Sequence, residues 1–300
     1  MTNAGIRLVW LPDMTRKRGA LFALLSALMF GVGTPLIKLR FSAVEPLLLS
    51  ALINLGSTVG VALFADIVRG PSKLFTRENR VPFTGSLLFG AILGPVLLVW
   101  GIGHTPGSAA ALLLNLEAAF TAVIAWLIFR EHMGPRVVFG LVLTTLGGVV
   151  VSANAGTGPG RFSAGLAIAG ACLCWAIDNN CTVRLRDVAP AQFTFWKGLI
   201  SGGILLVACL AWGISLPTGR TLAEAAALGA CCHGLALLVF VMALQRLGAG
   251  RTAAYFAMAP FAGAATAVLL LDDPVTPQLL LAAALMAGGV ASLFTEPHHS

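Results

Sequence analysis

The sequence predicts an all-α polytopic membrane protein, with ten transmembrane helices arranged as two inverted five-helix repeats. Three observations carry this prediction: the low content of charge, the succession of long apolar segments, and the recurrence of first-half patterns in the second half. Only 10% of the 300 residues are charged and 58% are hydrophobic, whereas a soluble globular chain carries about 25% charged residues. The chain therefore has too few charges to cover a water-facing surface.

The apolar segments are long enough to cross a membrane one after another. A hydrocarbon core about 30 Å thick needs about 20 apolar residues per helix, and breaks rich in Pro, Gly and charge separate ten such segments. The break between the third and fourth segments is short and uncharged, so it predicts a tight hairpin. We expect helices at residues 19–37, 45–68, 82–103, 107–129, 136–154, 163–185, 190–213, 221–246, 250–271 and 276–294.

The second half of the chain repeats patterns of the first half. A glycine precedes a basic-Leu-Arg triplet at the same spacing in both halves: Gly19 with residues 38–40, and Gly165 with residues 184–186. An acid precedes a Gly-Gly pair at the same spacing in both halves: Glu131 with residues 147–148, and Asp272 with residues 288–289. These recurrences divide the chain into a polar N-terminal tail (1–18), a first repeat (19–154) and a second repeat (163–294).

Basic residues are distributed unequally between the two ends of the expected helices. An even number of spans places both termini on one side, and basic residues are retained in the cytoplasm. If that side is the cytoplasm, fourteen Lys and Arg residues lie inside and only four outside, namely Lys38, Arg40, Arg161 and Arg220. We therefore expect both termini, including an uncleaved tail, in the cytoplasm. Because each repeat has five spans, the repeats have opposite orientations, as in transporters whose binding site lies near the bilayer midplane.

Two stretches resemble a known family. Residues 240–254, followed by Pro260, resemble the helix eight to nine signature of the drug/metabolite transporter superfamily, EamA family, and residues 100–111 form the first-half counterpart. The acid before Gly-Gly in helices five and ten, and Phe30-Gly31 before Lys38 in helix one, also match. The chain is most similar in layout to the ten-helix aromatic amino acid exporters of that family.

The resemblance implies a secondary transporter shaped like a basket. Helices one, three, four, six, eight and nine would surround a central cavity, and helices five and ten would act as scaffold. Members of the family export amino acids or other metabolites across the bacterial inner membrane, which gives the expected location. The two halves differ at important positions: Glu117 stands near the position of Pro260, and Ala51 matches Lys197. Functional residues of relatives therefore cannot be copied to both halves.

Several functional classes are disfavoured by composition. The net charge is +7, but the basic residues lie at helix ends, where they serve topology and lipid headgroups rather than nucleic acid. The six cysteines lie inside apolar segments without metal-ligand spacing, so we expect no metal and no disulfide framework. No phosphate-binding motif occurs, so we expect no cofactor and a carrier driven by gradients. The expected partners are a small-molecule substrate and the lipid bilayer; the oligomeric state is open, and a monomer is compatible with the pattern.

Polar residues within the apolar segments are the first candidates for the site, because hydrocarbon offers them no partners. Glu117, with Asn115 nearby, lies near the middle of helix four and could contact a substrate amine, titrate a coupling proton, or form a structural hydrogen bond. The cluster Asp178-Asn179-Asn180 could contact substrate or satisfy unwound backbone, and Asp178 could instead pair locally with Arg184.

Two further polar residues have alternative interpretations. His233 lies within helix eight, where a lone histidine more often forms a structural hydrogen bond than a proton relay. Lys197 lies about two turns into helix seven, where it could pair with Asp178 or extend to the cytoplasmic face.

Aromatic residues form the second set of candidates. Trp100, Trp175, Tyr255 and Phe256 fall in helices that line the cavity in the family, and flat apolar side chains suit an aromatic or apolar substrate. Lipid contact and packing are the alternative roles. Three prolines within spans could serve as hinges: Pro35, Pro95 and Pro260.

The sequence favours export of small zwitterionic metabolites, foremost amino acids with aromatic or apolar side chains, by alternating access between the repeats. A proton-coupled drug or metabolite antiporter, with Glu117 as the coupling residue, is the alternative. An integral membrane lipid-modifying enzyme is a distant third. Asp272-Asp273 could suggest a metal-binding pair, but no partner acidic motif accompanies it, so we do not expect an enzyme.

Overall fold

The structure is a computed structural model that describes residues 12–41, 44–64, 73–129, 134–153, 159–182, 184–185, 187–247 and 255–294. Its described residues form helices and connecting turns without any strand. The elements are α1 (Pro12–Phe41), α2 (Pro46–Phe64), η1 (Lys73–Phe75), α3 (Arg80–Gly85), η2 (Ser86–Leu93), α4 (Gly94–His104), α5 (Gly107–Leu113), α6 (Leu116–Phe129), α7 (Pro135–Ala153), α8 (Pro159–Thr182), α9 (Pro190–Ala211), α10 (Gly219–Leu228), η3 (Gly229–Leu235), α11 (Ala236–Leu247), α13 (Ala259–Leu271) and α14 (Pro277–Phe294).

Each of the ten expected spans contains one of these helices, so the predicted polytopic fold class is confirmed. Seven of the described helices are long and apolar enough to cross a membrane, and three shorter apolar helices accompany them. The third span is continuous through α3, η2 and α4, and the eighth through α10, η3 and α11. Helix α1 begins at Pro12, so the last residues of the segment expected as a tail are already helical. Residues 1–11 lie outside the described part of the chain.

The two repeats run in opposite directions. Near the end of α1, Lys38 Nζ donates to the carbonyl oxygens of Ile102 and Thr105, at 3.0 and 2.6 Å, so this end lies beside the end of α4. Gly101 of α4 lies against residues 164–168, which belong to the first half of α8. The end of α1 and the beginning of α8 therefore lie at the same end of the bundle, as inverted repeats require.

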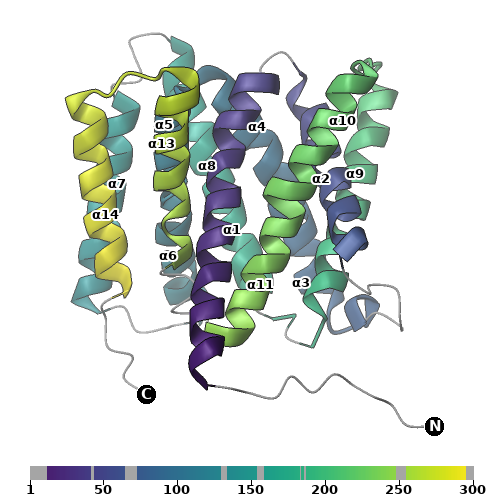
Figure 1. The fold of residues 1–300 in the computed structure, drawn as a ribbon, viewed down its shortest axis with the longest axis horizontal. Coiled ribbons are helices and arrows are strands. Elements are labelled where there is room, and N and C mark those ends of the chain that lie inside the picture. The colour runs from purple at the N-terminus through teal and green to yellow at the C-terminus, as the bar shows by residue number, and fades with distance from the viewer. Residues whose placement is uncertain are drawn as a thin grey trace.

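Helices α1, α11 and α13 lie nearer the viewer than α4, α6 and α8 (Figure 1). The front layer, here called the aromatic layer, consists of α1, the η3–α11 segment and α13. The rear layer, here called the polar layer, consists of α8, the η2–α4 segment and α6. Each layer mixes the repeats, because α1 of the first repeat packs on α11 and α13 of the second, and α8 of the second packs on α4 and α6 of the first. Helices α2 and α9 pack together on one side of the layers.

Helices α7 and α14 pack together at the opposite end of the bundle (Figure 1). Their contact depends on small residues: a Cβ added to Gly289 would lie 2.3 Å from Thr144 Oγ1, and one added to Gly147 would lie 2.6 Å from Met286 Cγ. Small residues let helix backbones approach closely in a membrane. The Gly-Gly pairs of the sequence thus belong to the scaffold that holds the two repeats together.

Candidate functional site

Both repeats interrupt the same two helices. The third and eighth spans each contain a π-helical segment, η2 and η3, which begin at residues 86 and 229. The fourth and ninth spans are each broken by a two-residue turn, at 114–115 and at 257–258, and both interruptions recur at the same offset. Such interruptions leave backbone groups without helical partners and commonly mark functional sites in transporters. The sequence alone did not reveal them.

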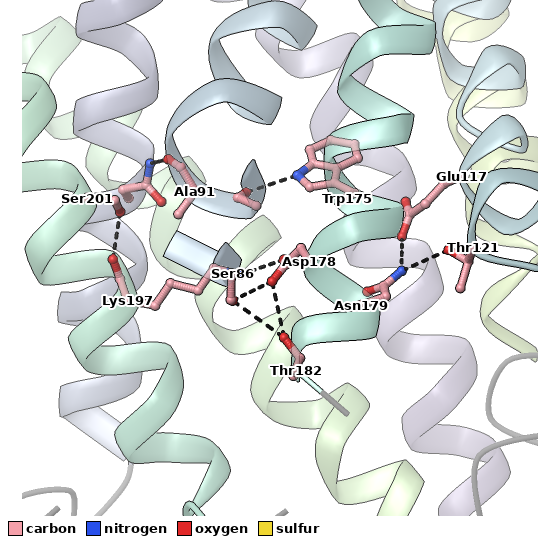
Figure 2. A network of polar contacts seen from close by, with 12 residues as sticks. Ser86, Ala91, Glu117, Thr121, Trp175, Asp178, Asn179, Thr182, Lys197 and Ser201 are labelled. Carbon is pink, nitrogen blue, oxygen red and sulfur yellow. Dashed lines mark hydrogen bonds and ion pairs between the residues drawn. The ribbon is translucent and has the colours of Figure 1, made fainter. Parts of the chain in front are cut away.

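A carboxylate lies beside η2 in the polar layer. Asp178 of α8 accepts hydrogen bonds from the hydroxyls of Ser86 in η2 and Thr182 in α8, the latter at 3.1 Å. Its other oxygen, Oδ2, accepts from Lys197 Nζ of α9 at 2.6 Å. The side chains of Lys197 and Asp178 are only 12% and 14% exposed. We call these four residues the Asp178 cluster; it joins three spans from both repeats (Figure 2).

The backbone of η2 is held by two side chains from other helices. Trp175 Nε1 of α8 donates to the carbonyl oxygen of Gly90 at 3.0 Å. Asn54 Nδ2 of α2 donates to the carbonyl oxygen of Ala91 at 2.9 Å and to that of Ser50 at 2.9 Å. These donors satisfy carbonyls within the interruption, which would otherwise be costly in hydrocarbon. Trp175 therefore has a definite polar partner in the backbone of η2.

A second carboxylate lies on another side of α8. Glu117 is in the first turn of α6, directly after the break in the fourth span, where a helix N-terminus favours negative charge. Asn179 Nδ2 donates to Glu117 Oε1 at 2.8 Å and reaches Thr121 Oγ1 at 3.4 Å. We call these three residues the Glu117 cluster. Figure 2 shows that Asp178 and Asn179 leave α8 toward different helices, so α8 separates the two carboxylates.

The corresponding helices of the aromatic layer carry rings instead of charges. Phe30 of α1 meets His233 of η3 edge to face, with ring centroids 5.6 Å apart, and meets Phe256 of the ninth span at 5.3 Å. Phe240 of α11 meets Phe256 at 4.8 Å. We call these four residues the aromatic cluster. His233 thus packs among aromatic rings at the interruption of the eighth span.

The structure places other predicted site residues apart from these clusters. Trp100 stacks on His104 at the end of α4, with centroids 4.8 Å apart, and both line a pocket of about 160 Å³ near Lys38. Asn115 is buried at the break of the fourth span, where its amide donates to Leu112 O at 3.0 Å and lies 3.8 Å from Met286 Sδ of α14. Tyr255 is 38% exposed.

The three candidate hinge prolines have different surroundings. Pro35 lies inside the unbroken helix α1 and is buried. Pro95 follows η2 in the first turn of α4, and Pro260 follows the turn at 257–258 in the first turn of α13. Proline is well tolerated in a first turn, because its missing N–H has no helical partner there. Two of the three prolines therefore stand where an interrupted helix restarts.

Of the two interpretations of Lys197, the ion pair with Asp178 is the one found. The sequence predicted the pairing of Lys197 with Asp178 only as one of two alternatives, and it did not point to Ser86, Thr182 or Thr121. Serine and threonine are common in apolar helices and give no signal of their own. Ser86 and Gly90 are four residues apart, which places them on one face of the third span. This spacing of a serine and a glycine was the available sequence signal for a polar contact on that face.

Together, the fold and these clusters define a multi-pass membrane protein of two like repeats that bring polar and aromatic groups to matched helix interruptions. The family model described as the EamA-like transporter family matches residues 17–153 and 162–295, and the chain belongs to this family. The predicted resemblance is therefore confirmed.

Relatives extend along nearly the whole chain. An uncharacterized transporter of Methanothermobacter thermautotrophicus is 25% identical over 94% of this chain and 87% of its own. Proteins named probable amino-acid metabolite efflux pump from Salmonella typhimurium and Escherichia coli are each 24% identical over 92% of this chain and 94% of their own. A crystal structure matches with a TM-score of 0.66 at 21% identity, covering 94% of this chain and 98% of that one, and so shows the same fold.

Proposed function

We propose that this transporter exports small zwitterionic metabolites, foremost amino acids with aromatic or apolar side chains, by alternating access between its two repeats. The observation that carries the proposal is the pairing of opposite chemistries at matched positions: carboxylates and amides in the polar layer, rings in the aromatic layer. An aromatic amino acid combines the same two chemistries. Two relatives named as probable amino-acid metabolite efflux pumps support this substrate class.

In this proposal Glu117 accepts the hydrogen bonds of the substrate's α-ammonium group. Its partner Asn179 is a neutral amide, and among the described residues no Lys, Arg or His lies within ion-pair distance of it. An ammonium would therefore supply the opposite charge that a carboxylate in a membrane requires. The side chain of the substrate would lie against Trp175 and the aromatic cluster. We place the protein in a bacterial inner membrane with both termini in the cytoplasm.

The interruptions provide places where the layers can change shape. Alternating access requires one repeat to move against the other around a central site. We propose that η2, η3 and the two turns act as hinges in this movement, together with Pro95 and Pro260 beside them and with Pro35 inside α1 as a further hinge.

The test is a transport screen in liposomes that contain the purified protein. Labelled phenylalanine, leucine, aspartate and succinate would be loaded and their release followed with and without a proton gradient. We expect saturable release of phenylalanine and leucine well above that from empty liposomes. Release indistinguishable from empty liposomes for all four compounds would remove the proposal.

The absence of a cationic partner for Glu117 among the described residues also favours a second candidate, a proton-coupled antiporter. A proton could neutralise Glu117 whenever substrate is absent. Glu117→Gln would then eliminate the dependence of flux on the proton gradient while substrate is still bound. An unchanged dependence on the gradient in that variant would take Glu117 out of the coupling mechanism.

A structural role for Asp273 speaks against a lipid-modifying enzyme. Asp273 Oδ2 accepts hydrogen bonds from the backbone N–H and the hydroxyl of Ser108, at 2.7 and 2.9 Å. Ser108 lies in the first turn of α5, so Asp273 satisfies a free helix N–H of the other repeat. We therefore propose that the protein is a carrier without enzymatic activity.

A further inference from the structure

The surroundings of Asp178 are those expected of a carboxylate that binds a primary ammonium group. We propose that it forms the centre of a second ammonium-binding site, and that Lys197 of the same chain occupies this site. Its ligand class is a small primary ammonium ion, because Lys197 presents that chemical group to the carboxylate. Nothing in the proposed export mechanism requires this second site.

The site is arranged by groups other than the lysine. The hydroxyls of Ser86 and Thr182 both reach Asp178 Oδ1, whereas Lys197 binds Oδ2. Two O–H donors from different spans therefore orient the carboxylate, and its other oxygen faces the ammonium. Bonds between an ammonium and a carboxylate are among the strong hydrogen bonds of proteins.

Space for the ion pair comes from a glycine. A Cβ added to Gly90 would lie 2.1 Å from Asp178 Oδ2 and 2.7 Å from Lys197 Nζ. Both charged groups thus lie directly against the backbone of η2. The Nζ atom also lies 5.1 Å from the centroid of the Phe193 ring, and aromatic rings attract ammonium groups. One ammonium group is therefore enclosed by a carboxylate, an aromatic ring and the helix backbone at a glycine.

The two carboxylates that adjoin α8 differ in what neutralises them. Asp178 has a tethered cation, whereas Glu117 has a neutral amide. A cation stabilises a carboxylate with so little exposure, and at Asp178 Lys197 supplies it. This consequence rests on the proposed function: with Asp178 filled, the carrier directs the single ammonium of its substrate to Glu117.

The test is chemical rescue of Lys197→Ala by propylammonium, which corresponds to the end of the missing side chain. The purified full-length variant would be heated in propylammonium chloride, in tetramethylammonium chloride, which has no N–H donor, and in sodium chloride, all at equal ionic strength. A ligand that binds only the folded state stabilises it. We expect propylammonium alone to raise the unfolding midpoint of Lys197→Ala by at least about 3 °C.

Two controls separate the ammonium site from a general effect. Wild type and Lys73→Ala, which alters the exposed end of η1, should show no such rise. The double variant Asp178→Asn with Lys197→Ala removes the carboxylate as well, so it should also show none. An equal rise in the double variant, or no rise in Lys197→Ala, would overturn the proposal.

The experiment still tests the proposal even if Lys197→Ala is too unstable to purify without added salt. Recovery of folded Lys197→Ala only when propylammonium is present during purification would support the proposal, and aggregation in all three salts would overturn it. Because the readout is unfolding and not flux, it is independent of the exported substrate. If the wild type released no amino acid from liposomes, the proposed function would be wrong. The ammonium-site proposal would still stand or fall on the unfolding measurement alone.

Discussion

The polar layer and the aromatic layer have equivalent helices and equivalent interruptions, but they hold those interruptions with different interactions. In the polar layer, side chains from α8 and α2 donate to the carbonyls of η2. In the aromatic layer, the ring of His233 in η3 packs against that of Phe30. The difference indicates that duplication preserved the helix geometry while the side chains at the interruptions diverged. The site is therefore best sought where the two repeats disagree.

The largest loss of stability is expected when the space beside η2 is filled. We expect Gly90→Ala to destabilise the protein by about 3–5 kcal/mol, because its methyl group would displace the Asp178–Lys197 pair and a separated buried ion pair costs that much. Thermal unfolding in detergent would measure the loss. Gly203→Ala, at a glycine with no atom within 4 Å of an added Cβ, is the matched control and should unfold like wild type. Equal midpoints for both variants would contradict this interpretation of Gly90.

A smaller effect is expected when the donor to η2 is removed. Trp175→Phe keeps a ring but leaves the Gly90 carbonyl without its indole partner, and an unsatisfied buried group costs about 1–3 kcal/mol. Trp126→Phe, at a residue that is 47% exposed, changes the same atoms without breaking a described bond. The prediction fails if the unfolding midpoints of the two variants agree.

The aromatic layer should respond in selectivity rather than in stability. Phe30 contacts both His233 and Phe256, so Phe30→Ala removes the centre of the aromatic cluster. We expect release of phenylalanine to fall about tenfold relative to release of alanine, since aromatic pairs contribute about 0.5–1.5 kcal/mol beyond burial. Competition between the two labelled amino acids would measure the ratio. A ratio equal to that of wild type would mean that substrate does not contact this layer.

The smallest effect should come from the edge of the Glu117 cluster. The Asn179–Thr121 contact is long, at 3.4 Å, and exposed, so Thr121→Val should reduce the initial rate of release less than threefold. A loss as large as that from changing Glu117 itself would show that Thr121, and not Glu117, is the principal polar contact.

Much of the fold could be predicted because hydrophobic length and basic-residue counts are properties of whole segments. Segment lengths predicted the ten spans and the tight hairpin at residues 105–106. The basic-residue counts predicted the opposite orientations of the two repeats. The π-helical segments could not be predicted, because one extra residue in a turn leaves the apolar pattern nearly unchanged. Residues 86–93 and 229–235 read as ordinary apolar helix.

The sequence indicated which helices carry the site more readily than which face of each helix is directed toward it. Glu117, Asp178 and Asn179 were identified because polar groups are costly in hydrocarbon, and the structure brings them to adjoining sides of α8. Asn115 satisfied the same criterion, but it is directed toward Met286 of α14. Trp100 lies in the expected span but about 15 Å along it from Gly90. Membership of a lining helix does not specify depth or direction.

The central claim is that Glu117 receives the ammonium of an exported amino acid. The most direct measurement is the initial rate of labelled phenylalanine release from liposomes that contain equal amounts of wild type and Glu117→Gln, with unfolding midpoints checked in parallel. Losing a charged hydrogen-bond partner costs about 2–5 kcal/mol, so the predicted rate falls at least about thirtyfold while the midpoint stays close to that of wild type. A rate equal to that of wild type would contradict the account.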